Sequence, residues 1–107
     1  MDIFKRQSGS TLTVTLRGEL DQHSADTARR ELDSLIASEG VRTLVLDMRG
    51  VTFMDSSGLG VVLGRYRGMS RKGGGMRISG VSRCADRIMK MAGIYSLIEK
   101  DEQGGSI

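Results

Sequence analysis

The sequence predicts one α/β domain in which two strands are followed by three helix–strand units, in the order β-β-α-β-α-β-α-β. Three observations support this class. Apolar residues alternate with threonine over 11–16, which is typical of a strand with one buried face. Apolar residues recur at helical spacing over 24–39 and again over 57–69, and glycines separate these segments. Because strands and helices alternate, we expect a mixed, partly parallel sheet with helices mainly on one face.

The first part of the chain is predicted to form a hairpin and a helix. Residues 2–6 are expected to pair as an edge strand with 11–16, Gly18 to end the second strand, and residues 19–23 to form a loop. Ser24 is a favoured N-cap residue, and Gly40 suits the position where a left-handed residue stops a helix. The first helix therefore spans about 24–39. The residues expected on its inner face are Ala25, Ala28, Leu32, Leu35 and Ile36.

The middle of the chain contains the most apolar segment. The run Leu44-Val45-Leu46 indicates a strand over 41–48 that is covered on both faces, and hence the central strand. We expect a turn at Arg49-Gly50, then residues 51–54. A second helix begins near Ser57 and is broken by the three glycines at 73–75. Its expected inner face consists of Leu59, Val62, Leu63, Tyr66 and Met69.

The last part is predicted to add a strand over 76–81, a helix capped by Ser82 and ended by Gly93, and a short strand at Leu97-Ile98. The whole of 1–107 is expected to be one domain, with an ordered core over about 2–99 and a short flexible tail over 100–107. The residues expected on the inner face of the third helix are Ala85, Ile88, Met91 and Ala92.

Composition narrows the class of protein. The N-terminus has no apolar stretch able to act as a signal-peptide core, and no apolar run approaches the length of a membrane span. The single cysteine, Cys84, excludes an internal disulfide framework and a cysteine-based zinc cluster, and we expect it to be buried near the third helix. The seven methionines are expected to fill the core rather than form a docking surface. These features indicate a cytoplasmic protein without a metal or cofactor of its own.

Basic residues gather in the second half of the chain, and the net charge is +3. Such a bias is compatible with nucleic acid or with an acidic protein partner. Aromatic stacking residues are scarce, however, so we interpret the basic residues as two solvated helix faces and expect no nucleic-acid binding. The residues concerned are Arg65, Arg67, Arg71, Lys72, Arg83, Arg87 and Lys90.

Two serines stand where a strand is expected to end and a helix to begin, in the segment Phe53-Met54-Asp55-Ser56-Ser57-Gly58. The first N–H groups of a helix lack internal partners, and the dipole leaves partial positive charge there, so a phosphate on a serine is stabilised at this place. One alternative is that Ser56 or Ser57 only caps the helix. Capping and phosphorylation are compatible, so both stay open from the residues alone.

Glycines punctuate the same helix. Gly58, Gly60 and Gly64 do not match a dinucleotide fingerprint, which needs G-x-G-x-x-G, and no P-loop is present. Gly60, Gly64 and Gly68 lie four residues apart on one helix face. That bare strip permits close approach either of a partner or of the domain's own neighbouring elements, and the sequence does not decide between them.

The segment from Met54 to Tyr66 closely resembles the phosphorylation segment of STAS domains in the anti-sigma factor antagonist family, especially the sporulation (SpoIIAA) type. The segment from Gly18 to Ala25 resembles the first loop and helix start of that family, and the element order agrees over nearly the whole chain. Three features depart from the family pattern. Gln22 stands where histidine is common, Arg83 stands where proline is common, and 101–107 is short for the usual final helix.

The resemblance implies a regulatory binding protein rather than an enzyme. Its phosphoserine would be Ser56, in preference to Ser57, and its partner would be an anti-sigma factor with serine kinase activity that binds ATP and Mg²⁺ itself. Unphosphorylated, the protein would hold that partner and free a sigma factor, and a serine phosphatase would reset it. The residues expected to contact the partner are Glu19, Asp21, His23, Asp55, Ser57, Gly58, Gly60 and Gly64.

Two other functions are weighed against this one. The first is a STAS module that senses a ligand or nucleotide, or that serves a transporter or a stress-signalling complex. Nucleotide titration would distinguish it, because an anti-sigma factor antagonist needs no tight nucleotide site of its own. A hydrolase would use Ser56 or Ser57 as nucleophile, His23 as base and Asp21 or Asp55 as orienting group. It lacks the G-x-S-x-G elbow, and we expect His23 to be a surface loop residue instead. Solvation of the loop is the alternative role for Glu19 and Asp21, and turn formation is the alternative for Asp55.

Overall fold

The protein, seen here in a computed structural model that describes residues 1–101, contains one five-stranded sheet in the order β1-β2-β3-β4-β5. β1 (Asp2–Ser8) is antiparallel to β2 (Thr11–Leu20). β2, β3 (Thr43–Met54), β4 (Gly75–Val81) and β5 (Glu99–Lys100) are parallel, each to its neighbour. The predicted α/β class with a mixed, partly parallel sheet is confirmed.

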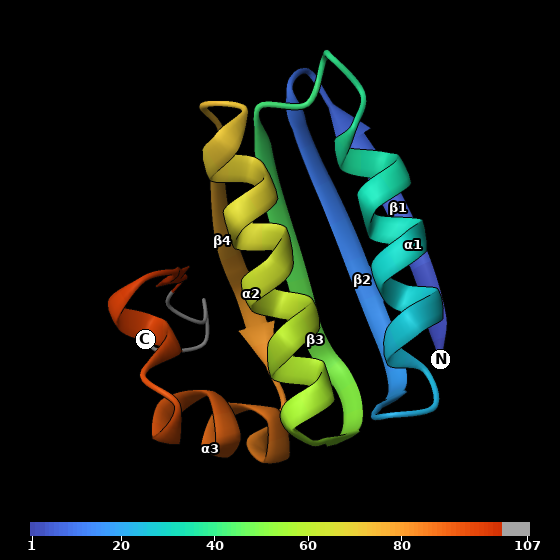
Figure 1. Ribbon diagram of the computed structural model, residues 1–107, viewed down its shortest axis with the longest axis vertical. Coiled ribbons are helices and arrows are strands. Elements are labelled where there is room, and N and C mark those ends of the chain that lie inside the picture. The colour runs from blue at the N-terminus through green and yellow to red at the C-terminus, as the bar shows by residue number, and fades with distance from the viewer. Residues whose placement is uncertain (102–107) are drawn as a thin grey trace.

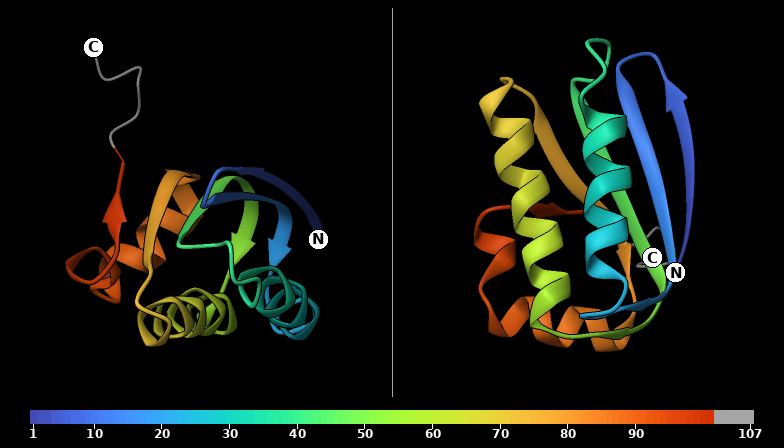
Figure 2. Two further views of the ribbon diagram at one scale, coloured as in Figure 1. Left: turned by 90° about the horizontal axis from the view of Figure 1, so that it is seen from above. Right: turned by 45° about the vertical axis from the view of Figure 1, so that its right-hand side comes forward.

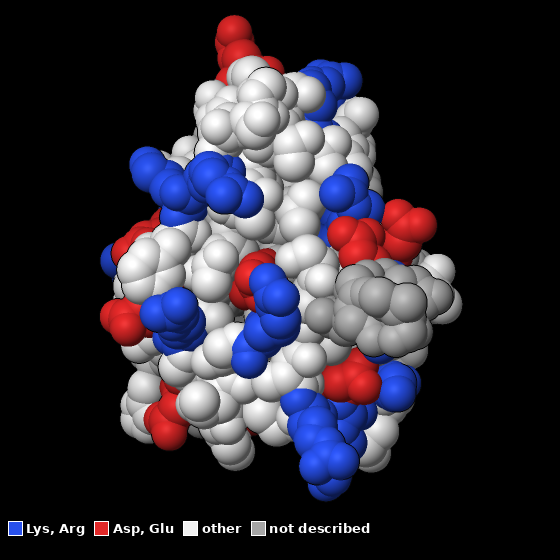
Figure 3. Space-filling model, turned by 180° about the vertical axis from the view of Figure 1, so that it is seen from behind, with Lys and Arg blue, Asp and Glu red and all other residues white. Residues whose placement is uncertain are grey.

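The helices gather on one side of this sheet. α1 (Ala25–Ile36) and α2 (Ser56–Arg71) lie side by side across one face, whereas α3 (Arg83–Met91) and the short 3-10 helix η1 (Ile94–Ser96) lie toward one end (Figures 1 and 2). Alternate residues of β2 point into the core beneath the helices, and the others point to the opposite face. That opposite face carries threonines and charged side chains around a shallow hollow (Figure 3).

The core lies between the sheet and the helices. Strands β2, β3 and β4, helices α1, α2 and α3, and η1 all contribute to it, and the alternation in β2 was predicted from the sequence. The largest fully buried side chains are Leu16, Leu20, Leu32, Leu44, Leu46, Met48, Met69, Ile78, Met89, Ile94, Ile98 and Val14.

Two predicted strand limits are wrong. β3 runs without interruption through Arg49-Gly50, where a turn was expected. A Cβ on Gly50 would lie 2.8 Å from Cγ of Arg17 and 3.2 Å from the carbonyl oxygen of Leu16, so this glycine permits close approach of β2 instead of a turn. β2 likewise continues past Gly18 to Leu20, with irregular register on either side of that residue.

The C-terminal part differs more. Leu97 is exposed, and the last strand is Glu99–Lys100 rather than Leu97-Ile98. On α3 the buried methionine is Met89; Met91, predicted to face inward, is 83% exposed, and Ala92 is exposed as well. The predicted flexible tail is wrong at its start, because Lys100 pairs in β5 and the N–H of Asp101 donates to Ile78 at 2.8 Å. The rest of that tail, 102–107, lies outside the described residues.

Two further expectations need correction. Cys84 is exposed, although its thiol lies 3.4 Å from the carbonyl oxygen of Val51. α1 ends at Ile36, so Gly40 is not its C′ residue.

Arg65 was expected on a solvated helix face, but its side chain is buried. Its Nε lies 2.9 Å from Oδ1 of Asp33, which joins α2 to α1, yet neither Nε nor Nη1 makes a hydrogen bond of good geometry within residues 1–101. Burial lowers the pKa of the Arg65 guanidinium, and the charge of Asp33 opposes that shift.

Removing Asp33 alone is therefore expected to lower the free energy of unfolding more than removing both Asp33 and the charge of Arg65. Asp33→Ala leaves a buried guanidinium without its counter-ion and should lower the free energy of unfolding by about 1–3 kcal/mol. Asp33→Ala combined with Arg65→Met should be close to wild type, since replacing a buried ion pair by apolar groups is often neutral. Urea denaturation followed by circular dichroism measures the stability of both variants. A double variant that is less stable than Asp33→Ala alone would contradict this account.

Candidate functional site

The carboxyl ends of β2 and β3 and the amino ends of α1 and α2 meet at one end of the molecule (Figure 1). The loop from Asp21 to Ser24 joins β2 to α1, and Asp55 alone joins β3 to α2. A shallow hollow lies between the two helices and is lined from both sides. The two segments that the sequence singled out, 18–25 and 54–66, are thus brought together at this end.

The helix start in the second segment is built around Asp55. This residue is the N-cap of α2, and its carboxylate accepts a hydrogen bond of 2.8 Å from the N–H of Ser57. Its carbonyl oxygen accepts from the N–H groups of Gly58 at 3.0 Å and Leu59 at 3.3 Å. Asp55 therefore does the capping that the sequence left open between Ser56 and Ser57.

The Ser56 side chain is not needed to cap α2. It is the first residue of α2 and is exposed, whereas Ser57 is half-buried. The Ser56 hydroxyl makes no hydrogen bond within residues 1–101. An exposed, unpartnered hydroxyl at the positive end of a 16-residue helix is accessible to a reagent and is placed where a phosphate would be stabilised.

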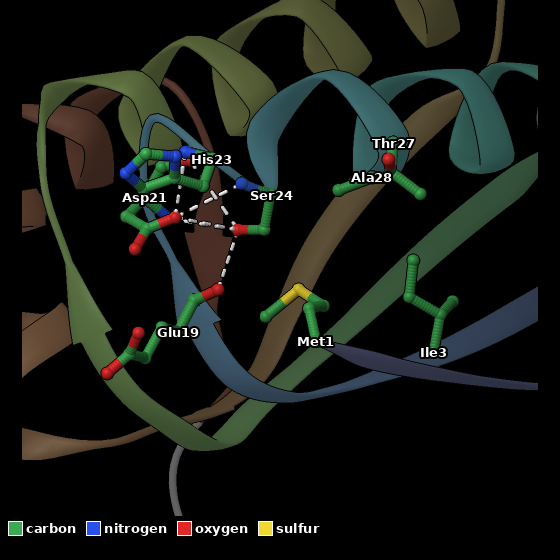
Figure 4. A pocket seen from close by; sticks show the side chains of 8 residues that line it. All are labelled: Met1, Ile3, Glu19, Asp21, His23, Ser24, Thr27 and Ala28. Carbon is green, nitrogen blue, oxygen red and sulfur yellow. Dashed lines mark hydrogen bonds between the residues drawn. The ribbon is translucent and has the colours of Figure 1, made fainter.

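The β2–α1 loop is held by its own hydrogen bonds (Figure 4). The Asp21 carboxylate accepts from the N–H groups of His23 at 2.9 Å and Ser24 at 3.1 Å. The hydrogen bond from the Ser24 N–H is the main cause of the lowered pKa of Asp21. Burial opposes this shift, and the hydrogen bond from the His23 N–H adds to it. The loop is therefore preorganised with a carboxylate at its centre.

Ser24 plays a different part from the one predicted. It stands at the N-cap position of α1 but makes no side-chain cap. Its hydroxyl instead donates to the carbonyl oxygen of Glu19 at 2.6 Å and accepts from the N–H of Asp21 at 3.1 Å. Ser24 thus closes the loop that carries Glu19, Asp21 and His23.

Two hollows flank this end of the molecule. One of about 370 Å³ lies between α1 and α2 beside the second serine, and is lined by Gln22, Ala25, Asp26, Arg29, Ser57, Gly60 and Val61. Asp26 forms ion pairs with Arg29 and Arg30 at its rim. The other, of about 440 Å³, lies on the far side of the loop (Figure 4) and is lined by Met1, Ile3, Glu19, Asp21, His23, Ser24, Thr27 and Ala28.

The glycines of α2 divide into two groups. A Cβ on Gly58 would lie 2.8 Å from the Leu20 carbonyl oxygen and 2.8 Å from Cγ of Met54, so packing explains this buried residue. Gly68 likewise approaches Ile36. Nothing lies within 4 Å of a Cβ built on Gly60 or Gly64. The strip is therefore open at its first two positions and packed at its third.

Phe53 was not among the predicted site residues, although it lies just before them. It is 48% exposed at the end of β3. The register jumps from the pair Gly18–Val51 to the pair Glu19–Phe53, so Thr52 is an extra residue on β3. Such a bulge re-aims the next side chain. Simple strand alternation gives no sign of this, which is why sequence reasoning missed an exposed aromatic beside the serines.

His23 is exposed in the loop, as expected, and its imidazole makes no hydrogen bond to Ser56, Ser57 or a carboxylate within residues 1–101. The hydrolase alternative thus gains no support from the geometry. In the same residues, no cluster of three or more His, Cys, Asp or Glu side chains could hold a metal ion. Nor does any helix of this part of the chain combine the length and apolar character needed to cross a membrane.

Comparison with protein families gives a match to the STAS domain over residues 2–103, almost the entire chain. The chain belongs to the STAS domain family. The resemblance found in the sequence is thereby confirmed.

Curated relatives of this STAS domain are regulators of sigma factors by name. It is 40% identical over 87 residues to an anti-sigma F factor antagonist of Paenibacillus polymyxa, covering 81% of this chain and 74% of the relative. It is 30% identical over 99 residues to the anti-sigma-B factor antagonist of Bacillus subtilis, covering 92% and 89%.

Solved structures share the fold. The anti-sigma factor antagonist SpoIIAA in its unphosphorylated form gives a TM-score of 0.80 at 24% identity, covering 98% of this chain and 92% of that one. The phosphorylated form of the Bacillus protein gives 0.74 at 24% identity, covering 98% and 96%. The STAS fold thus exists in both states of that relative.

Proposed function

We propose that this STAS domain is an anti-sigma factor antagonist of the cytoplasm that is switched by phosphorylation of Ser56. In its unphosphorylated form it binds an anti-sigma factor that is also a serine kinase, and so frees a sigma factor. Phosphorylation by that kinase ends the binding, and a serine phosphatase restores it. The observation that carries the proposal is the exposed Ser56 hydroxyl at the first position of α2, with capping already done by Asp55.

The names of the relatives support the partner, and the phosphorylated SpoIIAA structure supports the modification. The kinase brings ATP and Mg²⁺, so this chain needs only to present a hydroxyl. The Ser56 oxygen attacks the terminal phosphorus of ATP, ADP leaves, and the hydroxyl proton passes to a base. Asp55 lies next in sequence and is half-buried, but its carboxylate is already held by the Ser57 N–H. We therefore assign it to placing the serine.

The partner surface of this proposal surrounds Ser56. Glu19, Asp21 and His23 come from the preorganised loop, and Asp55, Ser57, Gly60 and Gly64 from the start and open face of α2. Gly58, also predicted as a partner contact, acts through the position of the helix because it is buried. We add Phe53 as an apolar anchor, since its side chain is 48% exposed and aromatic residues are enriched at protein interfaces.

The test is phosphorylation by the cognate kinase with matched alanine variants. Wild type and Ser57→Ala are expected to gain one phosphate in intact-mass spectrometry, and Ser56→Ala to gain none. Tandem mass spectrometry of the wild-type product should place the phosphate on Ser56. Phosphorylation of Ser56→Ala at the wild-type rate, or a wild-type mass left unchanged by the kinase and ATP, would overturn the proposal.

A further inference from the structure

β1 is an uncovered sheet edge. It pairs on one side with β2, and within residues 1–101 no strand lies beyond it (Figure 2). All residues of Asp2–Ser8 except Ile3 are exposed. An edge strand of this kind offers a row of unpaired backbone N–H and C=O groups to another strand.

The geometry of the β1–β2 hairpin determines which backbone N–H and C=O groups of β1 point away from β2. β1 and β2 are joined by two residues, Gly9 and Ser10, with φ of 60° at Gly9, so Ser8 and Thr11 form the closing hydrogen-bonded pair. In an antiparallel ladder hydrogen-bonded and non-hydrogen-bonded pairs alternate. The backbone groups of Phe4 and Arg6 therefore point to β2, and those of Ile3, Lys5 and Gln7 point outward.

The side chains of this edge are complementary to those of a second copy. In an antiparallel pairing centred on Phe4, the two phenyl rings face each other, and Asp2 of each copy lies opposite Arg6 of the other. The same register puts Ile3 opposite Lys5, so the outward backbone groups of both residues form hydrogen-bonded pairs. The next permitted register toward Ser8 would instead place Lys5 opposite Lys5, which repulsion disfavours. Charge thus favours the register centred on Phe4 over the next one toward Ser8.

The surroundings of β1 on both faces of the sheet support the same arrangement. A hollow of about 270 Å³ beside the strand is lined by Ile3, Lys5, Glu31, Ser34 and Leu35. In this register Lys5 of the second copy would lie opposite Ile3, so its side chain would reach this hollow, which Glu31 and the chain's own Lys5 line. On the open face, Phe4 is 50% exposed, with the Arg17 guanidinium 5.2 Å from its ring centre. Pairing would bury this exposed aromatic ring.

We propose that two copies of this chain associate through their β1 edges, around a two-fold axis at Phe4, and extend the two sheets into one. The occupant of the edge is a second copy because the sequence Asp2-Ile3-Phe4-Lys5-Arg6, paired antiparallel with itself, places the negative Asp2 opposite the positive Arg6. This surface is separate from Ser56 and does not depend on the function proposed above.

The experiment is sedimentation equilibrium of the purified protein over a concentration series reaching the millimolar range, at low and high salt. The wild type is expected to form a dimer that weakens at high salt. Asp2→Arg and Arg6→Asp each replace two attractive pairs by two repulsive ones and should raise the dissociation constant about tenfold or more. The double variant Asp2→Arg/Arg6→Asp restores opposite charges and should return the constant to near wild type.

A backbone variant provides an independent measurement. Lys5→Pro removes an outward N–H, which an edge strand tolerates, and should abolish the dimer, whereas Lys5→Thr keeps that N–H and should weaken it less. Thermal melts establish that each variant is folded. A wild type that is monomeric at every concentration, single charge variants that associate as well as wild type, or a double variant no better than either single one would overturn the proposal.

Discussion

Phosphorylation of Ser56 is expected to weaken binding of the kinase partner by about a hundredfold, and Ser56→Asp by about tenfold, whereas Ser56→Ala binds as the unmodified protein does. Phosphoserine carries about −1.5 to −2 charges at neutral pH. In the proposed complex this charge is covered by the partner, and Asp55, the preceding residue, adds a charge of the same sign. Burying an unpaired charge at an interface costs several kcal/mol, so the complex is weakened far more than the free domain is altered.

Isothermal titration of the partner at one salt concentration measures these differences. Ser70→Asp is the matched control, since it adds the same charge to an exposed serine in the last turn of the same helix, away from the site. It should bind like wild type. Equal affinity of Ser56→Asp and Ser56→Ala would contradict exclusion by charge. A large drop in the melting temperature of the phosphorylated protein would instead indicate a change of fold.

The order of elements and the position of Ser56 could be predicted because both depend on short-range patterns. Alternation over Thr11–Leu16 and helical spacing in α1 record which side of each element is buried. On α2, Val62 and Met69 are buried as predicted, whereas Leu59, Leu63 and Tyr66 are only partly buried. Gly50 was misinterpreted because a glycine serves equally in a turn and at a close contact between strands. Only the position of Arg17 across the sheet distinguishes the two.

The buried face of α3 could not be predicted from its sequence. Its nine residues contain Ile88, Met89 and Met91, and two inner faces are compatible with that run. Contact with β3 and with η1 selects the face that contains Ala85 and Met89 and leaves Met91 in solvent. The burial of Arg65 has the same origin, because its environment is made by Asp33 on another helix.

The two segments of the candidate site were singled out from the sequence, but the contacts within them were not predicted. The sequence predicted Ser24 as a helix cap and left open whether Ser56 or Ser57 capped the second helix, since serine is favoured at that position. In the structure Ser24 is engaged by the carbonyl oxygen of Glu19, and Asp55 replaces Ser56 as cap. Competition among nearby acceptors decides such roles, and it depends on distances that no local pattern specifies.

The second large effect is expected from Gly58→Ala, which should lower the free energy of unfolding by about 1–3 kcal/mol, the usual cost of overpacking. For a domain of this size that corresponds to a fall of about 4–8 °C in melting temperature for each kcal/mol. The added methyl group would meet the Leu20 carbonyl oxygen and Cγ of Met54, each at 2.8 Å, and a backbone oxygen cannot yield as a flexible side chain does. The amino end of α2 would have to move away from β2, and Ser56 would move with it.

Gly60→Ala is the matched control, two residues along the same helix. No atom lies within 4 Å of the added Cβ, so relief of the helix cost of glycine should stabilise the domain by about 1 kcal/mol. Thermal and urea denaturation of both variants measure the difference in stability. The rate of phosphorylation by the kinase, which reports the position of Ser56, is compared between Gly58→Ala and wild type, because Gly60 belongs to the proposed partner surface. Gly58→Ala should be less stable and phosphorylated more slowly even at temperatures where it is fully folded. If it were as stable as Gly60→Ala, the close packing of α2 on β2 could not be what positions the serine.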